Sequence, residues 1–206
     1  MEIDPRSVAI NLVKKLMIGC VVPRPIAVVS TVSAEGMPNV APFSYFTLAS
    51  HTPLSLLITV DGTKRDGSIK DTLRNAQFAE QGGIGEFVIN VADESYADQM
   101  AKSGESIPYG ESEFDHTGLT PVPSHSVKPP RVGEASVAFE CRTTHIIPIG
   151  ESRLVVGEVV HIHIKDELID EAYRIDPDKL LAVGRMAGSD YVRTRDRFEV
   201  RTIGRP

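Results

Sequence analysis

Cysteine is scarce in this sequence, and positive charge is not in excess. The two cysteines among the 206 residues, Cys20 and Cys141, are too far apart for a redox or zinc motif and imply no disulfide framework. Free thiols of this kind are typical of a reducing cytosol. The 22 Lys and Arg residues are outnumbered by 28 Asp and Glu residues, which gives a net charge of −6. Nucleic acids and anionic membranes are bound through clustered Lys and Arg, so this balance argues against both as partners.

Long apolar runs are also missing. The N-terminal region carries acidic residues early, and Pro23 interrupts its apolar stretch, so it predicts neither a secretory signal nor a membrane span. We therefore expect a cytoplasmic location. Hydrophobic residues make up 41% of the chain, which is ordinary for a globular protein. The length suffices for one substantial core but is tight for two, so we expect one domain over residues 1–206.

Apolar, β-branched runs bounded by Gly, Pro, Asp and Ser recur along the chain, which is typical of strands. They cover residues 26–32, 54–60, 86–91, 135–147 and 153–164, and the segment 36–50 adds one more. Helical patterns are fewer, at residues 6–18, 69–80, 94–102 and 177–183. Short hairpin connections favour antiparallel pairing. The expected fold is mainly β with peripheral helices, built as a small barrel of six mostly antiparallel strands.

The segment 36–50, GMPNVAPFSYFTLAS, begins like a hairpin turn but shows little alternation and carries two prolines. Proline removes a ladder donor and is tolerated at sheet edges, so Pro42 predicts a place where the sheet stops pairing. Backbone amides freed there can face a ligand. The side chains around this place are small, hydroxylic or aromatic: Asn39, Ala41, Ser44, Tyr45 and Phe46. They suit a flat ligand, although an irregular edge strand packed on the core explains the pattern equally well.

A helix start rich in hydroxyls and cations follows the strand at 54–60. Ser68 and Asp71 form a pair like a capping box, so we predict a helix from residue 69 that two glycines end at 82–83. The side chains gathered at its start are Thr63, Lys64, Arg65, Lys70 and Thr72. With free amides and the helix dipole, they would suit a phosphate. A solvated charged face is the ordinary alternative.

Other motifs are weaker. His161 and His163 fall on one face of a strand, a spacing that can ligate zinc. No third ligand is evident at a diagnostic spacing, so we expect no metal and interpret both as half-buried or cofactor-facing histidines. No serine lies in a nucleophile-elbow pattern. The Pro-rich segment 104–135 is too long for an ordinary connector and is expected to wrap the barrel or cover a site.

Four segments, in order, carry a specific resemblance: VVPRPIAVVSTVSAEGMPNVAPFSYF, GSIKDTLRNAQFAEQGGIGEFVINV, EFDHTGLTPVPSHSVKPPRVGEASVAFECR and LVVGEVVHIHI. The chain resembles the flavin reductase-like family of FMN-binding split barrels from about Val21 to Thr194. This resemblance implies a six-stranded antiparallel split β-barrel that binds FMN without a covalent bond, usually as a homodimer.

The resemblance also implies where FMN would lie. Residues 39–44 match the family's N-x-A-P-F-S strand at the isoalloxazine edge, residues 70–72 match its K-D-T element at the phosphate, and residues 30–31 match its S-T pair. The full set of predicted cofactor-binding residues is Arg24, Ser30, Thr31, Asn39, Ala41, Pro42, Ser44, Tyr45, Phe46, Lys64, Lys70, Asp71, Thr72, His163, Arg185 and Tyr191. No catalytic residue is assigned.

The function expected from this resemblance is NAD(P)H-dependent reduction of FMN. Hydride transfer to a flavin needs stacking and orientation more than an acid or base, so the lack of a catalytic triad is expected. The nicotinamide would lie on the flavin under the loop 104–130, with His163 and Arg185 as neighbours. A monooxygenase could receive the reduced flavin. Two alternatives stay open: an FMN-binding protein without turnover, and an FMN-dependent oxidoreductase that acts on another small molecule.

A homodimer is expected for a second reason. An edge-like flavin strand leaves Tyr45, Phe46 and the run 54–60 as surface that water would penalise, and a twofold pair covers such surface symmetrically. Each FMN would then lie near the subunit boundary. Part of the stretch 184–200, through Tyr191, is expected to reach a flavin site. The alternative is a monomer whose Pro-rich segment covers the edge.

Overall fold

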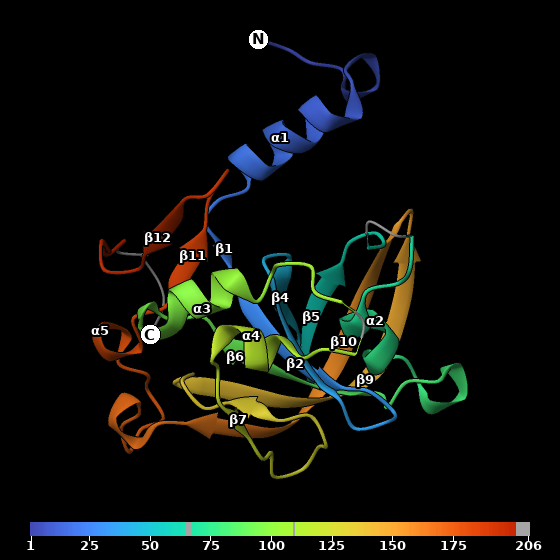
Figure 1. Cartoon of the computed structure of the whole chain (residues 1–206). Coiled ribbons are helices and arrows are strands. Elements are labelled where there is room, and N and C mark those ends of the chain that lie inside the picture. The colour runs from blue at the N-terminus through green and yellow to red at the C-terminus, as the bar shows by residue number, and fades with distance from the viewer. Residues whose placement is uncertain (65–66, 109, 201–206) are drawn as a thin grey trace.

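The computed structural model describes residues 1–64, 67–108 and 110–200. Its main sheet has seven strands, all antiparallel, in the order β3-β2-β6-β9-β10-β5-β4 (Figure 1). Their bounds are β2 (Ala27–Val32), β3 (Pro38–Phe43), β4 (Phe46–His51), β5 (Leu54–Val60), β6 (Glu86–Val91), β9 (Val137–Ile149) and β10 (Ser152–Ile164). The predicted class, mainly β with peripheral helices, is confirmed.

Seven strands appear instead of six because the segment 36–50 breaks in two. β3 ends and β4 begins on either side of Ser44 and Tyr45. β3 pairs with β2, whereas β4 pairs with β5 at the other end of the sheet. The Tyr45 carbonyl accepts a hydrogen bond from the Thr59 amide at 2.8 Å. Two consecutive strands thus form both edges of one sheet, which curls until the edges approach, as in a split barrel.

Pro42 lies in an edge strand. Its strand, β3, has the single neighbour β2, in which Pro42 is paired with Val28. The outer side of an edge has no ladder to lose, so a residue without an N–H is tolerated there. The prediction that the sheet stops pairing around Pro42 is confirmed.

Two apolar cores lie on opposite faces of β2, which explains why its sequence runs apolar without alternation. Val29 belongs to the core inside the barrel, and Val28 to a second core shared with Tyr96 and Met100. Gly157 in β10 is needed for the inner core, because a Cβ there would collide with the ring of Phe87. The barrel wall is therefore packed from both sides.

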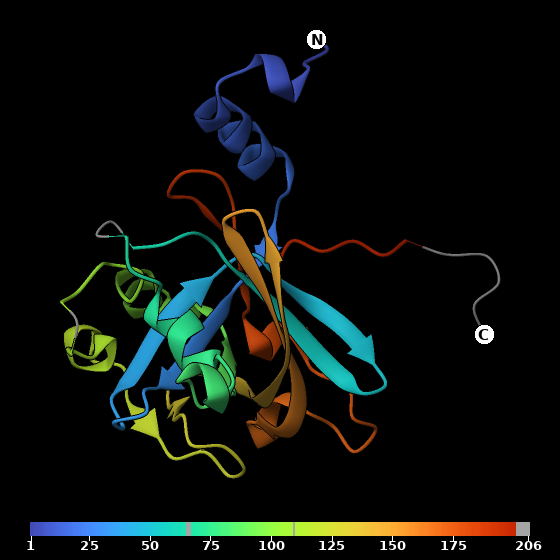
Figure 2. The same ribbon diagram turned by 90° about the vertical axis from the view of Figure 1, so that its right-hand side faces the viewer.

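Helix α1 (Ile10–Cys20) confirms the helix expected at 6–18, displaced toward the C-terminus behind a 3₁₀ turn at Pro5–Ser7. None of its residues is buried, and it projects from the barrel (Figures 1 and 2). The exposed side chains include Ile10 and Met17. A helix whose apolar side chains are at most half-buried leaves apolar surface to be covered.

Helix α2 (Asp71–Ala76) is shorter than the predicted helix, and the expected cap is wrong. Ser68 does not cap it: Lys70 is the residue before the helix, with extended backbone angles (φ −64°, ψ 142°). The cause lies in the turn that precedes it, which the Lys64 amide closes on the Ser68 carbonyl at 2.8 Å. Arg65, also predicted here, lies outside the described residues.

The remaining elements cover the barrel. The Pro-rich segment contains α4 (Glu113–Thr117) and both strands of a two-stranded sheet, β7 (Pro121–Val122) and β8 (Arg131–Val132). Helix α3 (Ala97–Lys102) precedes it. The C-terminal region contains α5 (Pro177–Leu180), β11 (Val183–Arg185) and β12 (Tyr191–Arg193). The two strands form a small sheet with β1 (Arg24–Pro25), in the order β1-β11-β12. Within the described ranges, no helix is long and apolar enough to cross a membrane.

Candidate functional site

A pocket of about 310 Å³, here named the β3–α2 pocket, lies between the edge strand β3, the start of α2 and the turn at residues 103–107. Seven predicted residues line it together: Asn39, Ala41, Pro42, Lys64, Lys70, Asp71 and Thr72. The Pro-rich segment supplies Glu113 and the turn, so the expectation that this segment covers a site fits the structure. Two motifs that are some thirty residues apart in sequence thus face one cavity.

A second pocket of about 430 Å³, the Arg24 pocket, adjoins the first and shares Pro42, Phe43 and Lys70 with it. Other predicted residues that line it are Arg24, Ser44, Tyr45 and Arg185. The two pockets form one groove along the exposed side of β3, hereafter the β3 groove. Pockets of about 300–1,000 Å³ are typical of small-molecule and cofactor sites.

The cations in the β3 groove differ in what they are paired with. Lys64 forms an ion pair with Asp71, to which Arg74 also donates at 3.3 Å. Lys70 has no carboxylate partner within the described part of the chain. Hydrogen bonds from Ser152 and Lys14 are the main cause of the lowered pKa of Asp61, and the charge of Lys70 adds to this lowering. Lys70 is therefore the lysine of the groove left available for an anion.

Glu113 is the acidic counterpart of these cations. It is 8% exposed and accepts a hydrogen bond from the Val40 amide at 3.2 Å. Burial raises the pKa of this carboxyl above its ordinary value, while the hydrogen bonds to its oxygens oppose the rise. A bound anion in the same pocket would favour its protonated form.

Asn39 connects the groove to the barrel wall. Its amide satisfies every neighbour when the nitrogen faces Glu113 at 3.2 Å and the oxygen faces the hydroxyls of Thr31 and Thr72 at 3.3 and 3.2 Å. Asn75 also donates to Thr31, at 3.0 Å. This buried polar network fixes Thr72 at the pocket wall, so the K-D-T element is held in place from below.

Two predicted residues lie beneath the groove rather than in it. Ser30 and Thr31 are fully buried and line neither pocket. The Ser30 hydroxyl donates to the Pro130 carbonyl at 2.5 Å, which ties the end of the Pro-rich segment to β2. In this structure both side chains support the site, and direct contact with a cofactor stays a prediction for them.

Arg24 acts as a structural tie at the mouth of the groove. It is 6% exposed, and its guanidinium donates to the carbonyls of Ile18, Val21 and Met186 at 2.8, 2.6 and 2.9 Å. Ser44 lies within hydrogen-bond range at 3.4 Å. These bonds join the end of α1 to the small C-terminal sheet, so Arg24 shapes the pocket that it lines.

The last predicted residues are distributed around this groove. Arg185 lies over the Tyr191 ring at 4.5 Å, and Tyr191 lines a different pocket beside α3. Phe46 lines a larger apolar pocket of about 1010 Å³ beneath α1, here the α1 pocket. His163 lines neither part of the groove and contacts Glu140 at 2.5 Å on β9. Burial raises the pKa of Glu140, but its hydrogen bonds outweigh this and lower it.

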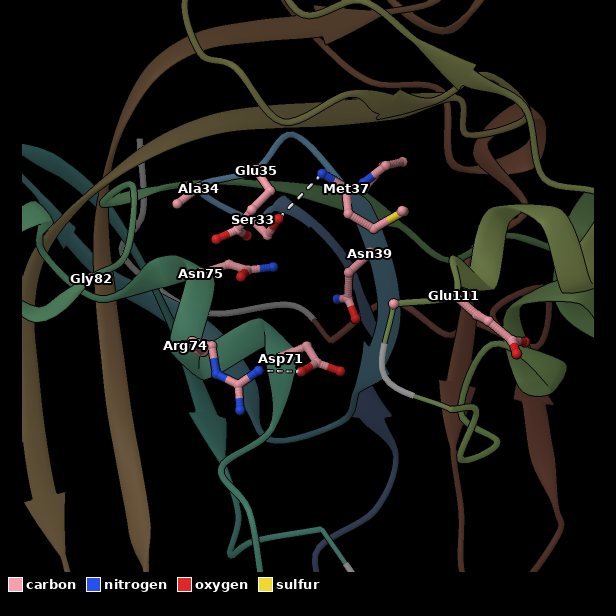
Figure 3. Close-up of a pocket in the computed structure, with 12 residues that line it drawn as sticks. Ser33, Ala34, Glu35, Met37, Asn39, Asp71, Arg74, Asn75, Gly82 and Glu111 are labelled. Carbon is pink, nitrogen blue, oxygen red and sulfur yellow. Dashed lines mark hydrogen bonds and ion pairs between the residues drawn. The ribbon is translucent and has the colours of Figure 1, made fainter.

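A further pocket of about 360 Å³ lies beside the β2–β3 hairpin and shares Asn39 and Asp71 with the β3–α2 pocket. Figure 3 shows Arg74 and Asn75 of α2 on one side of it and Glu111 on the other. The sequence prediction missed these residues and Glu113. Helical spacing from Asp71 could have indicated Arg74, whereas nothing in the loop distinguishes the two glutamates.

Comparison with known proteins identifies the architecture. A family model described as flavin reductase like domain matches residues 18–185. Nitrilotriacetate monooxygenase component B from Bacillus cereus is 33% identical, with a TM-score of 0.90 and coverage of 97% of this chain and 98% of that one. The 2-nitrobenzoate 2-nitroreductase NbaA from Pseudomonas fluorescens is also 33% identical, with a TM-score of 0.87 and coverage of 98% and 96%.

The fold agrees with a more distant structure. A Shewanella frigidimarina protein with a split barrel domain is 17% identical, with a TM-score of 0.83 and coverage of 98% of this chain and 99% of that one. The family match spans β1 to β11 and includes all the residues that line the β3 groove except Met186 and Gly188. It supports a flavin-dependent oxidoreductase. The chain belongs to the family of flavin reductase like domains.

Proposed function

We propose that this protein binds FMN non-covalently in the β3 groove and uses it to accept hydride from NADH or NADPH. One observation carries the proposal: the two family-matched motifs, at residues 39–44 and 70–72, face a single groove. The groove also holds Lys70, which pairs with no carboxylate in the described ranges. Both motifs are recognisable in the sequence alone. Their convergence on one cavity is what a shared ligand would require.

The donor set of the β3–α2 pocket suits a phosphate. Lys70 offers an ammonium that no carboxylate of the described residues pairs with, and the Thr72 hydroxyl is held at the pocket wall by Asn39. Charge-assisted hydrogen bonds from such groups to a phosphate are short and strong. The neighbouring Asp71 is already neutralised by Lys64 and Arg74, so its carboxylate opposes an anion less than a free one would.

The Arg24 pocket suits the flavin ring. Ser44 and Pro42 give it a wall with little side-chain bulk, and Tyr45 adds an aromatic face that is 40% exposed. The role of these residues is to orient and to exclude water from one face of a flat ligand. Bound FMN supplies the two-electron chemistry, so no residue of the chain needs to act as an acid or base.

The same proposal covers the reaction partners. The related proteins are a monooxygenase component and a nitroreductase, so the reduced flavin has two kinds of acceptor among them: a monooxygenase or a small molecule. We place a reductase first, and an FMN protein that acts directly on a small molecule second. Both are consistent with a cytoplasmic location, which the free thiols also favour.

A homodimer completes the proposal. β5 does not offer the expected apolar surface, because Leu56, Ile58 and Val60 are buried inside the barrel. The uncovered apolar surface belongs instead to α1 and β4, where Met17 is 57% and Leu48 63% exposed. A second copy docked on the α1 pocket would bury both and lie beside the Arg24 pocket, since both pockets include Tyr45.

Anaerobic mixing of the FMN-loaded protein with NADH and with NADPH tests the reaction. We expect bleaching of the flavin band within seconds with at least one donor. If neither donor bleaches a flavin that is demonstrably bound, the reductase assignment is wrong while FMN binding stands. Adding a nitroaromatic compound or oxygen afterwards distinguishes direct reduction of a small molecule from release of reduced flavin.

A further inference from the structure

Histidines gather on the barrel wall at the far end of the β9–β10 hairpin. His161 on β10 is the cross-strand partner of Glu140 on β9, and His163 lies two residues along on the same face. One ligand atom from each of these three residues lies within 4.8 Å of the other two. The sequence offered two histidines without a third ligand; the third comes from the neighbouring strand, where no spacing rule could show it.

The carboxylate of Glu140 is completely buried and held in a fixed orientation. One oxygen accepts from the His125 amide at 2.7 Å and contacts His163 Nε2 at 2.5 Å, and the other accepts from the Ser126 amide at 2.5 Å. Within the described ranges, no Lys or Arg pairs with it. Buried carboxylates without a cationic partner are unusual unless they are fully hydrogen-bonded or coordinate a metal.

Hydrogen bonding alone leaves His161 unexplained. The side-chain hydrogen bond to Glu140 is made by His163. The half-buried His161 has no hydrogen-bond partner among the described residues. Its ring is stacked on that of His125, with centroids 4.3 Å apart and planes at 13°, and lies 4.6 Å from the ring of His163. The His161 imidazole lies beside the buried Glu140 carboxylate without a hydrogen bond to the described residues, so one of its ring nitrogens is available to bind a metal ion.

We propose that Glu140, His161 and His163 bind one divalent transition-metal ion of the zinc class. Two imidazoles and a carboxylate are a ligand set that zinc accepts, and solvent would take the fourth position. Zinc bonds of about 2.0–2.2 Å in a tetrahedral arrangement require small side-chain movements. The His163 nitrogen and the Glu140 oxygen, now 2.5 Å apart, would separate to admit the ion. The ion would replace the proton shared by His163 and Glu140, and that proton would pass to solvent. His125 would shield the site from one side.

Such an ion would fasten the turn at 125–126 to the barrel wall. The two backbone amides of this turn bind the same carboxylate and would act as the outer contacts that orient it. The site lies outside the β3 groove, since none of the three ligands lines either of its pockets. The proposal therefore does not rest on FMN binding.

The test uses tag-free protein, because a polyhistidine tag would bind the ion itself. Chelator-treated full-length protein is titrated with zinc sulfate against a chromogenic chelator. We expect one zinc per chain, a rise in the thermal unfolding temperature on adding zinc, and no competition from Mg²⁺, which prefers oxygen ligands. His161→Ala should weaken zinc binding by about tenfold or more and abolish the thermal shift. Because His161 is only half-buried, this variant should keep the fold.

A matched control is available in His116, which pairs with Glu111 at 2.6 Å on the surface without a second histidine. His116→Ala should leave zinc binding unchanged. The proposal is overturned if the wild-type protein retains no zinc after gel filtration, or if His161→Ala and His163→Ala bind zinc as tightly as His116→Ala. In either case Glu140 and His163 form only a hydrogen-bonded pair.

Discussion

The two edges of the main sheet, β3 and β4, have the same exposed backbone but opposite surroundings. Beside β3 lie Lys70 and a polar network around Asn39, and the turn at 103–107 and Glu113 of α4 cover part of it. Beside β4 lie the apolar α1 pocket and the exposed Leu48. An unpaired edge is a liability that a protein must cover. The side chains around each edge indicate what covers it: an anionic ligand on β3 and a second copy of the chain on β4.

The largest expected effect concerns the β4 edge. Changing both Met17→Asp and Leu48→Asp removes two apolar side chains from the proposed interface. We expect a loss of about 3–6 kcal/mol, or 10²–10⁴-fold in dimer affinity. Light scattering after size exclusion, over a series of concentrations, measures it.

A matched control for this prediction is Tyr173→Asp, at a side chain that is 86% exposed on the far C-terminal region. It should leave the mass unchanged. A wild-type mass of a single chain with FMN still bound would overturn the dimer and place the whole cofactor site within one subunit.

The next effect concerns the β3 edge. Lys70→Ala should weaken FMN binding by about 1.5–3 kcal/mol, roughly 10- to 150-fold, because a charge-assisted contact to the phosphate is lost. Riboflavin, which lacks the phosphate, should bind almost equally to both proteins. Fluorescence titration measures the four affinities, with the exposed Lys128→Ala as control. Equal losses for FMN and riboflavin would show that Lys70 does not face the phosphate.

The smallest effect is the influence of pH through Glu113. Burial raises its pKa, so the neutral form is favoured as pH falls, and the charged form is present at higher pH. A charged Glu113 would oppose the phosphate by about 0.5–1 kcal/mol after screening. Glu113→Gln should therefore bind FMN two- to fivefold more tightly than wild type at pH 8. The difference should shrink as pH falls through the raised pKa.

The measured quantity is the ratio of the FMN affinities of Glu113→Gln and wild type at each pH. Titration of the FMN phosphate affects both proteins equally, so it cancels in this ratio. The variant keeps an oxygen that can accept from the Val40 amide, so the local fold is retained. A ratio that does not change with pH would indicate that Glu113 is not near the bound anion.

Much of the fold could be predicted because it depends on local patterns. The apolar runs located the strands, and Pro42 marked an edge, since a missing donor has the same effect in any sheet. The split of residues 36–50 into two strands could not be predicted. It depends on Thr59 in β5, whose backbone amide donates a hydrogen bond to the Tyr45 carbonyl between β3 and β4.

The residues of the candidate site also divide into those that local sequence patterns predict and those that depend on other segments of the chain. Lys70 and Thr72 could be predicted to lie together because they are close in sequence and match a family motif, and both line the β3–α2 pocket. Glu113 was missed because it reaches the groove from the first residue of the short helix α4, within a segment that carries no recognised motif. The start of α2 was misplaced because a turn closed by Lys64 keeps the chain extended as far as Lys70. A capping pattern gives a local preference, and a long-range or turn contact can override it.

Hydrogen–deuterium exchange of the protein with and without FMN tests the central claim most directly, because it reports on both edges in one experiment. Amides of β3, of residues 67–72 and of the turn 103–107 should exchange more slowly when FMN is bound. Amides of β4 should change little, since the second copy already covers them. Protection confined to β4 and α1, with none in β3, would contradict the account and place the cofactor at the other edge.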